Sequence, residues 1–298
     1  MIIAGPAYIK RGSAVFRSET DITVTITKDT KERKESIIGK FDEILLAVKA
    51  EIKFKPVEWL HLDELFPWAN LKLGQCLFGD DDVPTEIYSA DGQCYTFHRT
   101  AVTASPSIGA GVEKDLLGEA TITALIASNK NYGGVDALYA RKEATFDPVE
   151  LVEDAIFSIA YSVSYGDIVL DTEEGVDIEI SPTINERKRD EVGVFDYTFG
   201  GCEYTAKFKP INITEDQYNS IANPNGGVDR GRSLRSISKD LVVSGAKAGD
   251  PKFKITQAIC AGSQTLTFGL EAQRFGELEF RATSTQYDVP KFEISSVQ

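Results

Sequence analysis

Residues that carry covalent or metal chemistry are scarce in this chain. Its 298 residues include two histidines, His61 and His98, and four widely scattered cysteines without a C-x-x-C pair. The histidines do not have the spacing of a metal site, and no nucleophile elbow, phosphate-binding loop or dinucleotide-binding glycine pattern is present. The sequence therefore predicts a protein that is not an enzyme and that has no cofactor or metal, with its cysteines reduced.

Long apolar runs are also missing. No run approaches the roughly 20 residues that span a bilayer, and the N-terminal residues lack the basic start and apolar core of a signal peptide. We therefore expect no membrane contact and a protein made in a cytoplasm. Basic charge is in deficit, with 46 acidic against 32 basic residues and a net charge of −14. This balance argues against tight nucleic-acid binding, which needs a basic surface, although acidity that only keeps an abundant protein soluble is an equal alternative.

What the chain does contain is one long segment written twice. ERKESIIGKFDEILLAVKAEIKFKP runs from Glu32 to Pro56, and ERKRDEVGVFDYTFGGCEYTAKFKP runs from Glu186 to Pro210, 154 residues later and without a gap. Glu-Arg-Lys, a glycine, Phe-Asp and Lys-Phe-Lys-Pro recur at matching positions, which indicates an internal duplication. We predict two domains, 1–130 and 155–298, joined by a connector at 131–154.

The segments around the repeat predict long hairpins. Ile22, Val24 and Ile26 alternate with polar residues, and Val176, Ile178 and Ile180 do the same 154 residues later, as expected of half-buried strands. A charged segment follows each strand before apolar alternation resumes, which is longer than a simple chain reversal. We therefore expect two solvent-projecting arms, 28–40 and 182–194. Ordering such arms costs conformational entropy, so we expect something outside the domain to hold them.

The hydrophobic period changes after each Lys-Phe-Lys-Pro. Residues 58–66 place apolar side chains at helical spacing before Pro67, and residues 214–222 begin with a threonine suited to capping a helix. Further strands follow in both halves. The predicted fold is mainly β, with two tandem β-sandwich or barrel domains that each carry one short helix.

Three segments of the first half resemble a known family: FDEILLAVKAEIKFKPVEWLHLDELFPWANLKLGQCLFG, DGQCYTFHRTAVTASP and LLGEATITALIA. They are similar to the tail tube (major tail) proteins of long-tailed bacteriophages, over residues 2–128 and, through the repeat, more weakly over 156–285. The resemblance implies a structural virion protein whose domains form six-membered rings, stacked into the tail tube through which DNA passes without tight binding. Two domains per chain imply a homotrimer for each pseudo-hexameric ring.

The same resemblance implies partners and a place: other copies of the chain, the tape measure, terminator and distal tail proteins, and the virion tail, assembled in the host cytoplasm. It also implies that the arms contact the next ring, through charges of both signs worth about 0–1 kcal/mol per exposed pair. The residues expected in this contact are Glu32, Arg33, Lys34, Ile37, Ile38, Glu186, Arg187, Lys188 and Arg189.

Two other functions fit the sequence. The first is a related ring-forming tail protein, such as a distal tail, baseplate or terminator protein. The second is a two-domain ligand-binding β-module, which would need a concave aromatic cluster. The candidates for such a cluster, which do not obviously converge in the sequence, are Tyr132, Tyr139, Tyr161 and Tyr165.

Overall fold

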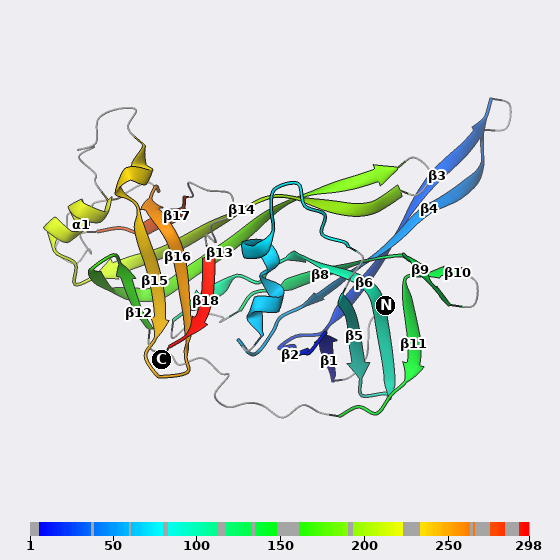
Figure 1. The fold of residues 1–298 in the computed structure, drawn as a ribbon, viewed down its shortest axis with the longest axis horizontal. Coiled ribbons are helices and arrows are strands. Elements are labelled where there is room, and N and C mark those ends of the chain that lie inside the picture. Colours follow the sequence, from blue (N-terminus) through cyan, green and yellow to red (C-terminus); the bar gives the residue numbers. More distant parts are fainter. Residues whose placement is uncertain are drawn as a thin grey trace.

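The computed structural model is mainly β, as the sequence predicts, and Figure 1 shows two sheet-containing halves from which long hairpins extend. The residues that it describes are 6–36, 39–59, 61–79, 83–111, 117–132, 135–147, 161–189, 193–222, 233–262, 265, 275–283 and 292–297.

The first half is built on one antiparallel sheet of eight strands, in the order β2-β1-β5-β6-β8-β4-β3, with β11 added beside β6. The Ser18–Pro56 bridge and the hydrogen bond from the Glu19 N–H to the Lys55 carbonyl (2.8 Å) join the end of β2 to the end of β4. A small separate sheet pairs β9 with β10. The strands are β1 (Ala7–Arg11), β2 (Ala14–Arg17), β3 (Thr23–Glu35), β4 (Gly39–Phe54), β5 (Val83–Ser89), β6 (Gln93–Ala104), β8 (Ala120–Leu125), β9 (Ala127–Tyr132), β10 (Val135–Ala137) and β11 (Tyr139–Glu143).

The second half repeats this plan. Its eight-stranded sheet has the order β12-β15-β16-β17-β14-β13-β7, with β18 beside β16 and a further pairing of β12 with β13. β18 on β16 takes the place that β11 has on β6. The strands are β7 (Ile108–Ala110), β12 (Tyr161–Tyr165), β13 (Ile168–Arg189), β14 (Gly193–Ile211), β15 (Lys239–Gly245), β16 (Pro251–Cys260), β17 (Leu278–Ala282) and β18 (Phe292–Ser296).

The two long hairpins, β3–β4 and β13–β14, have the same register. Every residue pair between β3 and β4 recurs between β13 and β14 with both numbers raised by 154, as Val24–Ile52 and Ile178–Ala206 illustrate. Both β-bulges of the first hairpin recur too, after Asp29 and Arg33 in one and after Thr183 and Arg187 in the other. A gapless sequence repeat has therefore produced two hairpins with the same register and with bulges at matching positions.

The predicted helices differ between the halves. α1 (Glu215–Ala222) begins at a capping box, in which the Thr214 hydroxyl accepts the Gln217 N–H (3.2 Å) and the Gln217 side chain accepts the Thr214 N–H (3.0 Å). In the first half the helical segment instead forms two 3-10 helices, η1 (Leu62–Leu65) and η2 (Pro67–Asn70). His61 precedes them with a left-handed φ of 64°, and Pro67 interrupts the backbone hydrogen bonding after one turn. A further 3-10 helix, η4 (Leu234–Ile237), precedes β15.

The alternating residues face the core as expected. Val24, Val176 and Ile178 are buried, and one hydrophobic cluster runs through both halves. Aromatic contacts cross the junction, as between the rings of Phe66 and Phe292, whose centroids lie 5.8 Å apart. β11 lies within 131–154, the range expected to be the connector, and the domain boundaries themselves stay a prediction.

Candidate assembly interface

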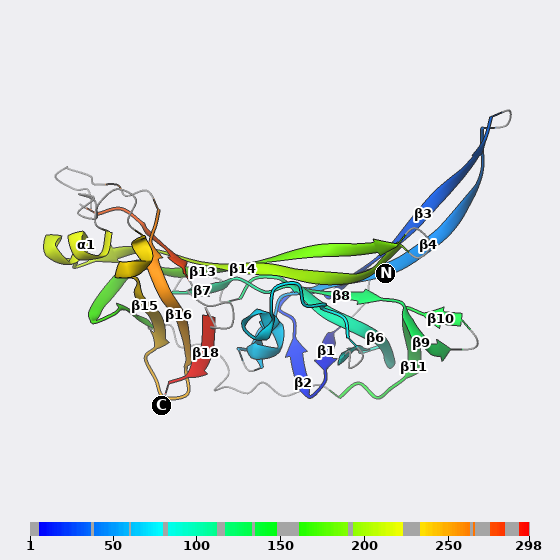
Figure 2. The same cartoon turned by 45° about the horizontal axis from the view of Figure 1, so that its top comes forward.

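The two arms, defined here as residues 28–48 of β3–β4 and residues 182–202 of β13–β14, have different surroundings. Figures 1 and 2 show the β13–β14 arm extending from the second half across the first half of the same chain. The β3–β4 arm projects at the opposite end of the molecule, beyond the first half and away from the second. The same hairpin is therefore seen once lying across another half and once projecting beyond it, with Asp29 and Ala47 at its base near Gly193 of the other arm.

The repeated charged motif has a local role in both arms. Arg33 lies directly opposite Asp42 and pairs with it at 3.7 Å, and Arg187 pairs with the corresponding Asp196 at 3.2 Å. The glutamate of each triplet pairs with the lysine two residues later on the same face, at 2.8 Å in the first arm and 2.7 Å in the second. Glu-Arg-Lys and Phe-Asp recur together because the arginine and the aspartate are cross-strand partners.

The β13–β14 arm is bound to the first half through its backbone. The residues after η2 run antiparallel to β14, with Cys76 opposite Thr198. The Leu77 N–H donates to the Tyr197 carbonyl (2.8 Å), and the Phe199 N–H donates to the Gln75 carbonyl (2.9 Å). A first-half strand also joins the second-half sheet, because β7 pairs with β13 over Val176–Ile178. The halves are thus joined by sheet hydrogen bonds at two places.

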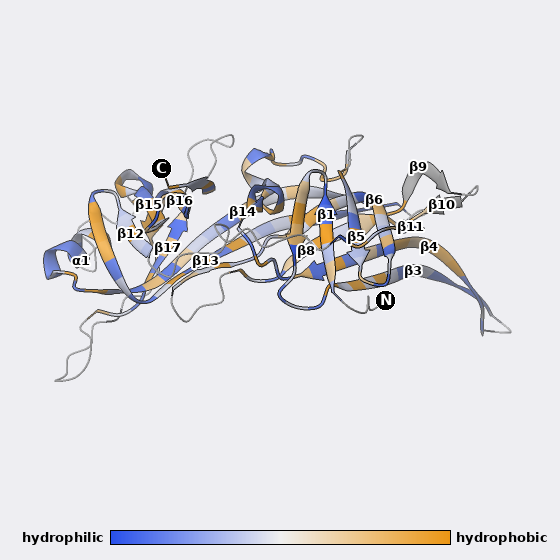
Figure 3. Ribbon diagram, turned by 90° about the horizontal axis from the view of Figure 1, so that it is seen from below, coloured by the Kyte–Doolittle hydropathy of each residue, from blue (hydrophilic) through white to orange (hydrophobic). Residues whose placement is uncertain are grey.

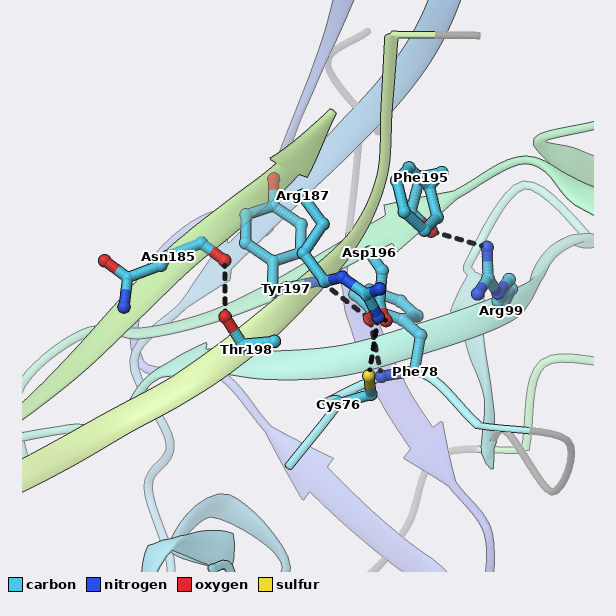
Figure 4. A network of polar contacts seen from close by, with 9 residues as sticks. All are labelled: Cys76, Phe78, Arg99, Asn185, Arg187, Phe195, Asp196, Tyr197 and Thr198. Atoms are coloured by element: carbon cyan, nitrogen blue, oxygen red, sulfur yellow. Dashed lines mark hydrogen bonds and ion pairs between the residues drawn. The ribbon is translucent and has the colours of Figure 1, made fainter. Parts of the chain in front are cut away.

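A polar network closes this contact at the Cys76 bridge (Figure 4). The buried Asp196 carboxylate accepts the Tyr197 N–H (2.7 Å) and, from the first half, the Phe78 N–H (3.3 Å). Arg187 donates to that carboxylate and also contacts the Cys76 sulfur at 3.0 Å. The hydrogen bond with Asp196, together with burial, raises the pKa of the Cys76 thiol despite the nearby arginine. A thiol held in its protonated form is a poor nucleophile, so this cluster is suited to holding two surfaces together.

Apolar side chains pack around the network. A separate hydrophobic cluster joins Val194, Tyr197 and Ile184 of the arm to Phe78, Ala101 and Leu125 of the first half. Phe199 stacks on Trp68 with ring centroids 5.8 Å apart. Arg99 of β6 donates to the Phe195 carbonyl (3.0 Å) and lies over the Phe78 ring. Figure 3 shows hydrophobic residues along β14 where it crosses the first half.

The residues predicted for contact between rings differ in what they contact in the structure. Glu186 forms an ion pair with Lys49 of the first half at 3.4 Å, and hydrogen bonding from Lys188 lowers the pKa of Glu186. Arg187 belongs to the network above, and Arg189 lies 4.6 Å from the Phe195 ring centroid. Glu32, Arg33 and Lys34 pair within their own arm, and Ile37 and Ile38 lie outside the described residues. Contact of these residues with a next ring stays a prediction.

Sequence reasoning missed the residues that receive the arm. Gln75, Cys76 and Phe78 lie between two predicted elements and outside the repeated segment, so the repeat assigns them no contact. One signal was available: Ile184, Val194 and Tyr197 replace Thr30, Lys40 and Glu43 of the first arm. Apolar residues at those three positions indicate that the second arm is covered by something.

Other kinds of site have little support in the described part of the chain. It contains no group of three or more histidine, cysteine, aspartate or glutamate residues that could hold a metal ion. A surface cavity of about 680 Å³ lies at the end of β1 and β2 and includes Tyr8, Arg17 and Phe146. Of the tyrosines proposed for a ligand cluster, Tyr139, Tyr161 and Tyr165 do not line it, and Tyr139 packs against Phe97; the side chain of Tyr132 lies outside the described part of the structure. Among the described residues, no helix has both the length and the apolar composition needed to cross a membrane.

Comparison with known proteins defines no family. No family model matches the chain, and no curated protein matches it in sequence. Among solved structures, the chain is similar to the anti-feeding prophage cap, described as a tube-terminating cap, with 10% sequence identity and a TM-score of 0.33. The match covers 52% of this chain and 96% of the cap protein. The class that the fold itself defines is a tandem-repeat β protein whose second half is docked on its first.

Proposed function

We propose that the protein is a structural, non-enzymatic protein of a bacteriophage tail. Copies of the chain join side by side into rings, and the rings stack into the tail tube through which DNA passes. The particular protein proposed is the major tail tube protein, with three chains and six repeated domains in each ring.

The observation that carries this proposal is the head-to-tail contact within the chain. Two units of the same fold are joined through different surfaces, the arm of one and the body of the other. Such a heterologous contact leaves an unused arm at one end and an unused body at the other, so further units add by the same contact. Repetition of the contact gives a closed ring or an open helix, depending on the rotation per unit.

The chemistry of the chain is consistent with this role. The residues that recur between the halves serve backbone geometry and cross-strand pairing, and the thiol at the contact is held protonated. A net charge of −14 disfavours adhesion of DNA, which carries one negative charge per about 1.7 Å of axis. A tube that must let DNA slide gains from a surface to which DNA does not adhere.

The test is the assembly state of the purified full-length chain. Sedimentation and negative-stain electron microscopy at rising concentration should show rings of three chains. These rings should stack into tubes when the other tail proteins are added. A chain that stays monomeric at high concentration, even beside those proteins, would refute the proposal. Rings that never stack would favour a terminator, distal tail or baseplate protein instead.

A further inference from the structure

Residues at matching positions of the two arms differ sharply in exposure. Phe199 is 5% exposed because it packs on Trp68, whereas Leu45, its counterpart in the β3–β4 arm, is 53% exposed. The Asp196 side chain is 6% exposed, whereas that of Asp42 is 50% exposed although it has the same arginine partner. The first arm thus shows the contact surface of the second arm without its cover.

The body of the second half shows the complementary difference. Strand β15 corresponds to β5 at an offset of 156 residues, because Val163–Val243 repeats the pairing of Ile9 with Ile87. At that offset Phe78, which is 4% exposed beneath the second arm, corresponds to Leu234, which is 41% exposed. Ile237 on the same turn, η4, is exposed as well. A large apolar side chain therefore lies uncovered at the position where the first half holds an arm.

We propose that the β3–β4 arm of one copy of the chain binds beside η4 on the second half of another copy. The inference rests on the proposed function, because it names the partner and the surface through which copies join. In this contact Leu45 takes the place that Phe199 has on the first half, and Leu234 lies beside Glu43, as Phe78 lies beside Tyr197. The backbone at Ser233 donates to the carbonyl of Glu43, as Leu77 donates to that of Tyr197, and Asp42 accepts the N–H of Leu234.

A second copy is the occupant because this chain cannot fill the site itself. The β3–β4 arm projects at the end of the molecule opposite the second half, as two views show (Figures 1 and 2). The body of the first half is already occupied by the β13–β14 arm. Only the second half of another molecule offers this arm a body with the same strand order.

Directed disulfide cross-linking between two differently labelled chains tests the proposal. One preparation carries Glu43→Cys and the other Ser233→Cys, both in a Cys76→Ser background, and both new cysteines replace exposed residues. Directly opposed residues of antiparallel strands place their Cα atoms about 4.5–5.5 Å apart, within the range that a disulfide spans. The preparations are mixed, concentrated and oxidised, then run on a non-reducing denaturing gel.

The expected result is a cross-linked dimer from the mixture and none from either preparation alone, because the contact joins an arm to a body. Ser162→Cys is the matched control. Ser162 is exposed in the same half, and its counterpart in the first half, Tyr8, stacks on Tyr88 of that half and not on an arm. A mixture that gives no dimer, or no more than the control mixture, would overturn the proposal. Rings in the microscope without this cross-link would overturn it while leaving the tail tube intact. If the cross-link forms in a protein whose rings never stack, the contact is supported and the proposed tail tube is refuted.

Discussion

Truncating the aromatic ring at the centre of the contact between the halves gives the sharpest test of the interface. Phe199→Ala removes a phenyl ring that is almost fully buried against Trp68 of the first half. Loss of a buried phenylalanine costs about 3–5 kcal/mol when its surroundings cannot collapse. We expect about 3 kcal/mol, because Phe199 lies at a junction whose backbone hydrogen bonds to Gln75 and Gly74 survive the substitution.

Leu45→Ala is the matched control, since Leu45 has the same place in the other arm. Its side chain is mostly exposed in the single chain, so its removal should change the free energy of unfolding by at most about 0.5 kcal/mol. Both variants keep the hairpin register and differ only in what covers the side chain.

Urea denaturation, carried out at a protein concentration so low that copies do not associate, measures both effects. Tryptophan fluorescence follows the transition, because both tryptophans, Trp59 and Trp68, lie in the first half and Trp68 is buried in the native protein. The two halves can unfold in separate steps, so the midpoint of this tryptophan transition is compared, not a single global value. Equal shifts for the two variants would refute the reasoning, because they would mean that the second arm is no better covered than the first.

Three further outcomes are expected. Asp196→Ala should destabilise the chain by about 2 kcal/mol in the same titration, because the Phe78 N–H then lacks a charged acceptor, whereas Asp42→Ala should have almost no effect. Gly175→Ala should be more damaging than Gly74→Ala, although both have positive φ: a Cβ at Gly175 would clash with the Ala110 carbonyl oxygen, while one at Gly74 meets nothing within 4 Å. Hydrogen exchange in β7 would show the difference. The lowered pKa of Glu186 means that its ion pair stabilises the fold above the pKa of an unfolded glutamate and is lost as the pH falls through the folded value. Acid unfolding of Glu186→Gln should therefore lack a step of under about 1 kcal/mol at pH values below the ordinary pKa of a glutamate.

The sequence predicted the parts of this structure that depend on local pattern and on the repeat. Alternation at Val24 and Ile178 identified the buried strands, and a repeat without gaps implied the shared register of the two hairpins. The capping threonine identified the start of α1. The same reasoning expected a helix after Pro56, where Leu62 and Leu65 have helical spacing but a left-handed His61 and Pro67 leave room only for 3-10 turns.

The surface on which an arm lies could not be predicted in the same way. Contact between Tyr197 and Phe78 depends on how the two halves are placed, and no periodicity encodes that placement. The charged triplets were singled out as contacts because they are conspicuous in the sequence. In the structure their arginines mainly hold the arm together, and the residues that bind the arm to the body are apolar or are backbone groups.

Divergence between the arms follows from the covalent link between the halves. The second arm meets a body on its own chain at a high effective concentration, so Ile184, Val194 and Tyr197 are covered as soon as both halves fold. The first arm must wait in solvent, where three apolar side chains at those positions would invite association with any exposed strand. The first arm has polar residues at these three positions, such as Lys40, which pairs with Glu32. They lower the risk of unspecific association and leave Leu45 as the main apolar anchor. In the proposed ring, a contact made this way is weaker for each copy, so we expect it to become stable only when several copies close the ring together.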